Sequence, residues 1–575
     1  MLRIKLIQRL FSLIKRKTTY TATTSPTTSE EQPTSKVLAS NVEEEAELDE
    51  RLGTDDLFFA SEHLPFTVMQ QHEQIFPKAK PTLLDPLIDE TQRVDKSGVC
   101  AVPFSQIPAI GGHLWLELCH LFSKCLYAIK GQNDEKLLSW IYPFRIFFDF
   151  YGPLVRINTP SKSSVVMLCK PKHILAVQKY DGTHSLRSII DSMENYRRTR
   201  ISITMPQYEI DFSQVAEKFK NHLNHRVNDY QYLCNQMAVD FVKRNYLIRD
   251  HRCEVPANYN GELCLWSLKC FSAIVFGRDA EYKQDGYTKI VHTLIEVSKA
   301  LSDCESAPQI WRFLPTTSTS KLAQCFDVLE TLLIRNLRMT YLKLGKLSKN
   351  VKNETPQPVA LLETMILKDK MSTDCIITTL MDLLVVGVNS IANIAGMVLY
   401  YLSKSPDVQD RLFWEINLVI PHDLNELFSE DMIHLPLLRA CIVETMRLWP
   451  PFTHTVRCTS KEIVVNGYTI PKNTNVIMAH QIAFHKNEHF ADAKKFEPRR
   501  WIGRFSKQLD PLEVMPFCHR QHPIIKELAY RQIAVLIAHM VKNFEIEYNY
   551  GEMSYESKIL SLPSKPLKFT LKDRH

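Results

Sequence analysis

The sequence lacks any pair of cysteines in Cys-x-x-Cys spacing, although it contains 14 cysteines among its 575 residues. This absence argues against a zinc site of clustered thiolates, and the scattered positions form no disulfide framework. We therefore expect ordinary buried thiols in a reducing compartment. The chain also lacks a strong excess of charge, because a net charge of +6 is too small to indicate a nucleic-acid partner.

The first 29 residues contain no aspartate or glutamate, yet they carry six basic residues. Apolar side chains alternate with these charges on a roughly helical period, which is typical of a mitochondrial transit segment. We predict such a segment over residues 1–29, with a surface-binding amphipathic helix or a disordered basic tail as the alternatives. No long apolar run follows Met1, which argues against membrane anchoring of the endoplasmic-reticulum type.

The composition then changes twice along the chain. Residues 30–60 are acidic and polar, which predicts a disordered linker. Residues 61–575 are expected to form a single folded domain. Within it, Tyr151–Arg156 and the apolar residues 165–168 are predicted to form a first strand pair, and Phe544–Arg574 a closing hairpin.

The longest apolar helix is predicted between Cys375 and Leu402, with about twenty uncharged residues after Asp382. Its length and composition would allow it to span a membrane. Polar residues at Asn389, Ser390 and Asn393 favour instead a buried core helix. The following helix is expected to start at Ser405-Pro406, with the serine as N-cap.

A second pattern lies nearer the C-terminus. Glu444 and Arg447 are three residues apart, so they share one face of a helix. About fifty residues later Arg500 and Trp501 follow Pro498, and a second arginine can complete a charge-assisted triad with the pair. A Glu-x-x-Arg pair alone is common on solvated helices, but this context favours a structural triad of Glu444, Arg447 and Arg500.

The order of these motifs, followed by Pro516-Phe517, resembles the cytochrome P450 family of heme-thiolate monooxygenases, and its mitochondrial branch in particular. The resemblance implies a mainly α fold with small β-sheets, the cytochrome P450-like fold, and heme as cofactor. It also implies that the long apolar helix crosses the distal face of the heme. The triad would then hold the layer beneath the heme.

The loop that should supply the thiolate ligand departs from the family pattern. Counted forward from Pro516-Phe517 the ligand position falls on Ile524, and counted back from Ala529 it falls on Pro523; neither side chain can bind iron. Cys518 lies about six residues too early, and the glycines that allow the tight turn are missing. His522 is a second weak candidate, as an imidazole ligand.

Other groups that the resemblance implies are also changed. Asn389 and Ser390 occupy the oxygen-activation positions, where an asparagine cannot serve as a proton-donating acid. The family's Trp-x-x-x-Arg segment, which binds a heme propionate, is expected at Asp211–His225, which contains no tryptophan. Arg457 remains as the expected propionate partner.

These observations favour a protein that keeps the fold for binding or scaffolding and lacks standard thiolate-heme catalysis. The alternatives are an active monooxygenase that hydroxylates a steroid-like or other lipophilic substrate with ferredoxin electrons, and a histidine-ligated heme protein. The expected partners are a lipophilic small molecule, a ferredoxin-type redox protein and a peripheral membrane contact, with no nucleic acid. The expected location is the mitochondrial matrix or inner-membrane surface. Candidate basic residues to receive an acidic ferredoxin are Lys494, Lys495, Arg504 and Lys507, and the alternative is a merely solvated basic face.

Overall fold

The computed structural model describes residues 102–110, 147–149, 151–157, 165–180, 192–193, 195–197, 212–277, 284–306, 311, 314–350, 360–420, 431–459, 461–503, 523–553, 555–557 and 561–574. All of them lie within one compact unit, Phe76–His575. The predicted transit segment and linker lie outside the described residues and stay predictions.

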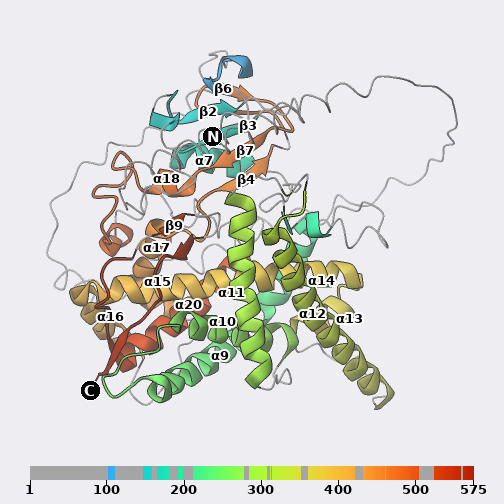
Figure 1. The fold of residues 1–575 in the computed structure, drawn as a ribbon, viewed down its shortest axis with the longest axis vertical. Helices are drawn as coiled ribbons and strands as arrows, with labels where there is room; N and C mark the ends of the chain where they lie inside the picture. The colour runs from blue at the N-terminus through green and yellow to red at the C-terminus, as the bar shows by residue number, and fades with distance from the viewer. Residues whose placement is uncertain are drawn as a thin grey trace, which may run out of the picture. The chain divides into compact units, whose positions relative to one another are not determined.

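Helices dominate this unit, as the resemblance implied (Figure 1). The α-helices are α7 (Pro171–Tyr180), α9 (Phe212–Ile248), α10 (Tyr259–Phe276), α11 (Gln284–Ser306), α12 (Thr317–Asn350), α13 (Leu361–Leu367), α14 (Thr373–Asp382), α15 (Asn389–Ser403), α16 (Pro406–Val419), α17 (Pro436–Leu448), α18 (His480–Phe484) and α20 (Pro523–Asn543). Short helical turns are η3 (Phe104–Gln106), η7 (Asp431–His434) and η8 (Pro498–Trp501).

The predicted long apolar helix is formed by α14, the π-helical segment η6 (Leu383–Val388) and α15, which follow one another without a break. Among the described residues it is the one helix long and apolar enough to span a membrane, and 67% of its most apolar window is buried within the protein. Helices α10, α17 and α20 pack against α15. This packing confirms the interpretation as a core helix.

One glycine on α15 lies close to two leucine side chains. A Cβ atom at Gly396 would lie 2.5 Å from Cδ1 of Leu567 and 3.0 Å from Cδ1 of Leu263. A larger residue at this position would therefore require the side chains of Leu567 and Leu263 to shift.

A five-stranded mixed sheet holds the N-terminal strands. Its order is β1 (Ala109–Ile110), β2 (Leu154–Ile157), β3 (Val165–Leu168), β7 (Asn475–Met478) and β4 (Thr455–Cys458). Strands β2 and β3 are antiparallel, with Leu154 opposite Leu168, which confirms the predicted strand pair. Their buried face packs with Phe148 and Ile482.

The described residues also form three two-stranded sheets: β5 (Ile463–Val465) with β6 (Tyr468–Ile470), β9 (Tyr555–Ser557) with β10 (Ser561–Pro563), and β8 (Phe544–Glu547) with β11 (Thr570–Asp573). Asn466 and Gly467 both have positive φ, 53° and 75°, as a tight two-residue hairpin requires. The antiparallel pairing of β8 with β11 confirms the predicted closing hairpin.

The start of α16 differs from the prediction in one respect. Pro406 is the first helical residue and Ser405 occupies the N-cap position, but the serine side chain makes no capping hydrogen bond. Its backbone carbonyl accepts from the amides of Val408 and Gln409 instead. The fixed φ of the proline is enough to start the helix without the hydroxyl.

Candidate functional site

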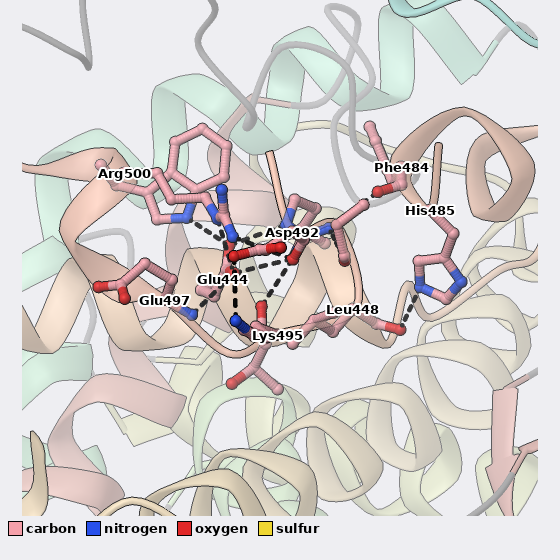
Figure 2. Close-up of polar contacts among 12 residues, drawn as sticks. Glu444, Leu448, Phe484, His485, Asp492, Lys495, Glu497 and Arg500 are labelled. Atoms are coloured by element: carbon pink, nitrogen blue, oxygen red, sulfur yellow. Dashed lines mark hydrogen bonds and ion pairs between the residues drawn. The ribbon is translucent and has the colours of Figure 1, made fainter. Parts of the chain in front are cut away.

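The carboxylate of Glu444 is the centre of a buried polar cluster between α17 and η8 (Figure 2). Its Oε1 accepts from Nη2 of Arg447 at 2.8 Å, from Nε of Arg500 at 3.0 Å and from the amide of Glu497 at 3.0 Å. Its Oε2 accepts from Nε of Arg447 and from the indole of Trp501, both at 2.9 Å. Five donors thus surround one fully buried carboxylate.

Each N–H group of the Arg447 guanidinium also has a hydrogen-bond partner. Two of its five N–H groups form the fork on Glu444, and the other three donate to backbone carbonyls. These carbonyls belong to Phe484 at 2.8 Å, Ala493 at 2.7 Å and Lys495 at 3.2 Å. The guanidinium also lies over the ring of Phe490, 5.1 Å from its centroid. One arginine therefore fixes the irregular chain between α18 and η8.

The predicted triad residues are brought together, but their positions are unequal. Glu444 and Arg447 have no exposed side-chain surface, whereas the side chain of Arg500 is 16% exposed. Arg500 also donates to the carbonyl of Ala491 at 2.6 Å. Sequence reasoning missed Trp501 as a hydrogen-bond donor, although its indole N–H is required to find a partner once the ring is buried. All five N–H groups of Arg447 have an acceptor, and Glu444 accepts five hydrogen bonds, so the buried pair serves an architectural role.

Asn389 lies at the junction of η6 and α15 and is buried. Its Nδ2 donates to the carbonyl of Val385 at 3.0 Å, one turn back, and to the carbonyl of Leu294 on α11 at 3.1 Å. Its Oδ1 accepts from the thiol of Cys264 on α10 at 3.7 Å. The carboxamide joins three helices where the family would place an acid. Ser390, the second predicted residue, is buried beside it.

The π-helical segment η6 precedes Asn389 directly, and a π-bulge often marks a functional position in a helix. Leu384 and Val385 are buried, whereas Leu383, Val386 and Gly387 keep part of their surface exposed. Asp382, at the start of this face, forms an ion pair with Arg197. Partial exposure therefore follows one side of the central helix up to the Asn389 turn.

Upstream of Asp211, Tyr196 and Arg200 have the four-residue spacing of the Trp-x-x-x-Arg pattern, with tyrosine in place of tryptophan. The hydroxyl of Tyr196 contacts carboxylate oxygens of Asp327 at 2.7 Å and Glu330 at 3.0 Å on α12. Burial and these carboxylates raise the pKa of Tyr196 well above its usual range. The side chains of Asp211–His225, where the propionate-binding segment was predicted, lie outside the described residues.

Arg457 lies on β4 and is buried, with its backbone opposite Val476 of β7. Its expected role toward a propionate stays a prediction. The neighbouring His454 cannot supply a proton at neutral pH, because burial lowers its pKa to about 3. His480 contacts the hydroxyl of Thr455 through Nε2 at 2.7 Å.

The iron-ligand position that the family pattern predicts falls at the beginning of α20. Pro523 and Ile524, which cover both registers of the ligand position, are the first two residues of the helix. A proline ring and an isoleucine side chain have no lone pair for iron, so these positions do not fit thiolate ligation. The weak candidates Cys518 and His522 lie outside the described residues, as do Arg504 and Lys507. Among the basic residues predicted to receive a ferredoxin, Lys495 forms an ion pair with Asp492 at 3.0 Å.

A sequence model of cytochrome P450 matches residues 141–571 of this chain. The chain belongs to the cytochrome P450 family. It is 26% identical over 520 residues to "Probable cytochrome P450 12a5, mitochondrial" of Drosophila melanogaster, covering 84% of this chain and 93% of that protein. It is 27% identical over 354 residues to "Probable cytochrome P450 49a1" of the same organism, covering 59% of each. Over 215 residues, 36% of this chain and 40% of its relative, it is 30% identical to mouse "Sterol 26-hydroxylase, mitochondrial".

These matches confirm the resemblance to mitochondrial-type cytochrome P450s, and heme is the cofactor that membership implies. The fold class is also confirmed, since the described residues form helices with small sheets. The predicted departures at the ligand position and at Asn389 stay predictions.

A second buried carboxylate, Glu415, connects α16 to α17, the helix that carries Glu444. Glu415 accepts from the amides of Leu437 at 2.8 Å and Leu438 at 3.0 Å, which are free N–H groups of the first turn of α17. Burial raises the pKa of Glu415 to about 8, although the two amides act in the opposite direction.

The raised pKa of Glu415 predicts a pH-dependent stability. The folded state holds this proton more tightly than the unfolded state. The stability that Glu415 contributes to the folded protein is therefore fully present below about pH 4.5 and is lost as pH rises through about 8. Unfolding by urea should show a slope from this group of up to about 1.4 kcal/mol per pH unit between these values. The difference between wild type and Glu415→Gln isolates that slope from the histidines, and parallel curves would contradict the prediction.

Proposed function

We propose that this protein keeps the cytochrome P450 fold to bind a lipophilic molecule and does not perform thiolate-heme catalysis. The observation that carries the proposal is the start of α20, where Pro523 and Ile524 occupy the positions expected of the iron ligand. Without a thiolate, the electron donation that favours cleavage of the oxygen–oxygen bond is missing.

The central helix supports the proposal independently. The amide of Asn389 is directed at the backbone carbonyls of Leu294 and Val385, so it holds helices together and has no acidic proton to deliver. Two elements that are far apart in the sequence have therefore lost groups that the family's oxygen chemistry needs. Both elements keep their place in the fold.

The ligand class follows from the relatives. One of them is named as a sterol hydroxylase, and apolar side chains of η6, Leu383 and Val386, keep part of their surface exposed. We infer a sterol-like or other lipophilic ligand with few polar groups. A ferredoxin partner is needed only where iron is reduced, so the proposed binding function does not require one.

The test is the heme content of the full-length protein, expressed with excess heme, and its absorption after reduction and addition of carbon monoxide. We expect heme at well below one equivalent and no thiolate-type difference spectrum. A thiolate-type spectrum that disappears in Cys518→Ala would replace this proposal with an active monooxygenase that uses ferredoxin electrons. A histidine-type spectrum that depends on His522 or His519 would indicate a histidine-ligated heme protein.

We further propose a location in the mitochondrial matrix or at the inner-membrane surface, because relatives are named mitochondrial and the first 29 residues are basic and acid-free. Residues 1–35 fused to a fluorescent reporter should direct it into mitochondria and be shortened. A variant with Arg3, Lys5 and Arg9 changed to glutamine is the matched control and should remain in the cytosol. A full-length cytosolic reporter with the natural residues would contradict the prediction.

A further inference from the structure

The second half of α12 exposes basic and apolar side chains on one face. Met339 is 61% and Leu342 62% exposed, and both belong to the large apolar residues that the fold leaves uncovered. The residues of this face are spaced three or four positions apart, as on one side of a helix. We call this face the α12 surface; it consists of Arg335, Arg338, Met339, Leu342 and Lys346.

The charge of this region has one sign. From residue 331 to residue 353 the sequence contains six lysines or arginines and no aspartate or glutamate. Arg335, Arg338 and Lys346 are exposed, and none of them forms an ion pair within the described part of the chain. Lys343, to one side of this face, is 3.3 Å from Glu363. The surface therefore presents a local excess of positive charge.

The opposite face of the same helix attaches it to the protein. Leu333, Leu337 and Leu344 are buried, and α12 packs against α11, α13 and α14. In Figure 1 the C-terminal end of α12 extends beyond these neighbouring helices. Met339 and Leu342 lie outside this buried apolar stripe.

We propose that the α12 surface binds the surface of a lipid bilayer that contains anionic lipids. Basic side chains that flank exposed apolar ones are the pattern of a helix lying at a membrane interface, where the apolar groups enter the headgroup region and the cations contact the phosphates. An acidic protein would complement the basic side chains, but its charged surface would offer no apolar partner to Met339 and Leu342. The long stems of lysine and arginine can also lie along apolar surface while their charges reach the headgroups.

The α12 surface adds a membrane-binding site to the proposed location, and this proposal does not depend on whether the protein binds heme. Import into mitochondria can succeed while vesicle binding fails, and vesicle binding can succeed whatever spectrum the protein shows. The two proposals are therefore tested by different measurements.

The test is co-sedimentation of the full-length protein with vesicles of 70% phosphatidylcholine and 30% phosphatidylglycerol, compared with vesicles of phosphatidylcholine alone. Wild type should bind the anionic vesicles more tightly. Arg335→Gln/Lys346→Gln should lower the partition coefficient about tenfold or more, because each basic residue near an anionic surface contributes roughly fivefold. Met339→Ser/Leu342→Ser should also lower it. Residues 1–29 are the same in all variants, so the differences report on α12.

A matched control lies on α16, where Trp414 is 64% and Leu418 73% exposed at a four-residue spacing. That helix carries Asp407 and Asp410 on its surface, so Trp414→Ser/Leu418→Ser should leave binding unchanged. A second readout locates the contact: brominated lipids should quench the added fluorescence of Leu342→Trp in anionic vesicles. Absence of that quenching, equal partitioning of wild type and the α12 variants, or an equal loss in the α16 control would each overturn the proposal. So would α12 variants that lose binding to an acidic ferredoxin while they keep vesicle binding.

Discussion

Replacing Arg447 with methionine is expected to lower the free energy of unfolding by about 3–5 kcal/mol, because the substitution leaves the carboxylate of Glu444 buried without its principal counter-charge. The carbonyls of Phe484, Ala493 and Lys495 lose their donors at the same time. Denaturant unfolding of the heme-free protein measures this difference. Arg447→Lys should recover little of it, since an ammonium group has three donors and cannot form the bidentate fork.

Arg500→Ala is the matched comparison, and we expect it to lower the free energy of unfolding by only about 1–2 kcal/mol. The side chain of Arg500 lies at the edge of the cluster, and Glu444 keeps Arg447, Trp501 and the amide of Glu497 as donors after its removal. The sequence alone treated both arginines as equal members of a triad. Equal destabilisation by the two variants would contradict the ranking that the hydrogen bonds imply.

The part of this cluster that the sequence could predict is its set of charged side chains, including the distant Arg500, which its Pro-x-Arg-Trp context indicated. Glu444 and Arg447 face each other because any helix places residues three apart on one face. The partners of the remaining three N–H groups of Arg447 are backbone carbonyls of an irregular segment, and no side-chain pattern encodes where a carbonyl points. The same reason explains why Glu415 was missed: its partners are the amides of α17.

In the central helix, too, some features were predicted from the sequence and others depend on tertiary contacts. Its length and burial were predicted from an apolar run interrupted by Asn389, Ser390 and Asn393. The π-helical segment before Asn389 was not predicted, because a wider turn depends on tertiary contacts more than on composition. The contacts of Asn389 with Leu294 and Cys264 join positions about 95 and 125 residues away, which only the fold brings together.

Those contacts predict that an acid restored at position 389 will damage the protein. In Asn389→Asp, a carboxylate oxygen replaces the amide nitrogen that now donates to the carbonyls of Val385 and Leu294, so acceptor faces acceptor in a buried site. We expect a loss of about 2–4 kcal/mol in the free energy of unfolding at pH 7, from two lost hydrogen bonds and a desolvated charge.

The pH dependence separates the charge from the lost hydrogen bonds. Burial raises the pKa of an aspartate, and a protonated carboxyl can donate to one of the two carbonyls, so the defect of Asn389→Asp should shrink as pH falls from 7 to 5. Asn389→Ala removes the same two donors and adds no charge; it should destabilise less than Asn389→Asp at pH 7 and show no such recovery. If Asn389→Asp is as stable as wild type at pH 7, the side chain must face away from both carbonyls. Position 389 would then be open to proton delivery, and the main structural argument from the central helix against oxygen chemistry would fall.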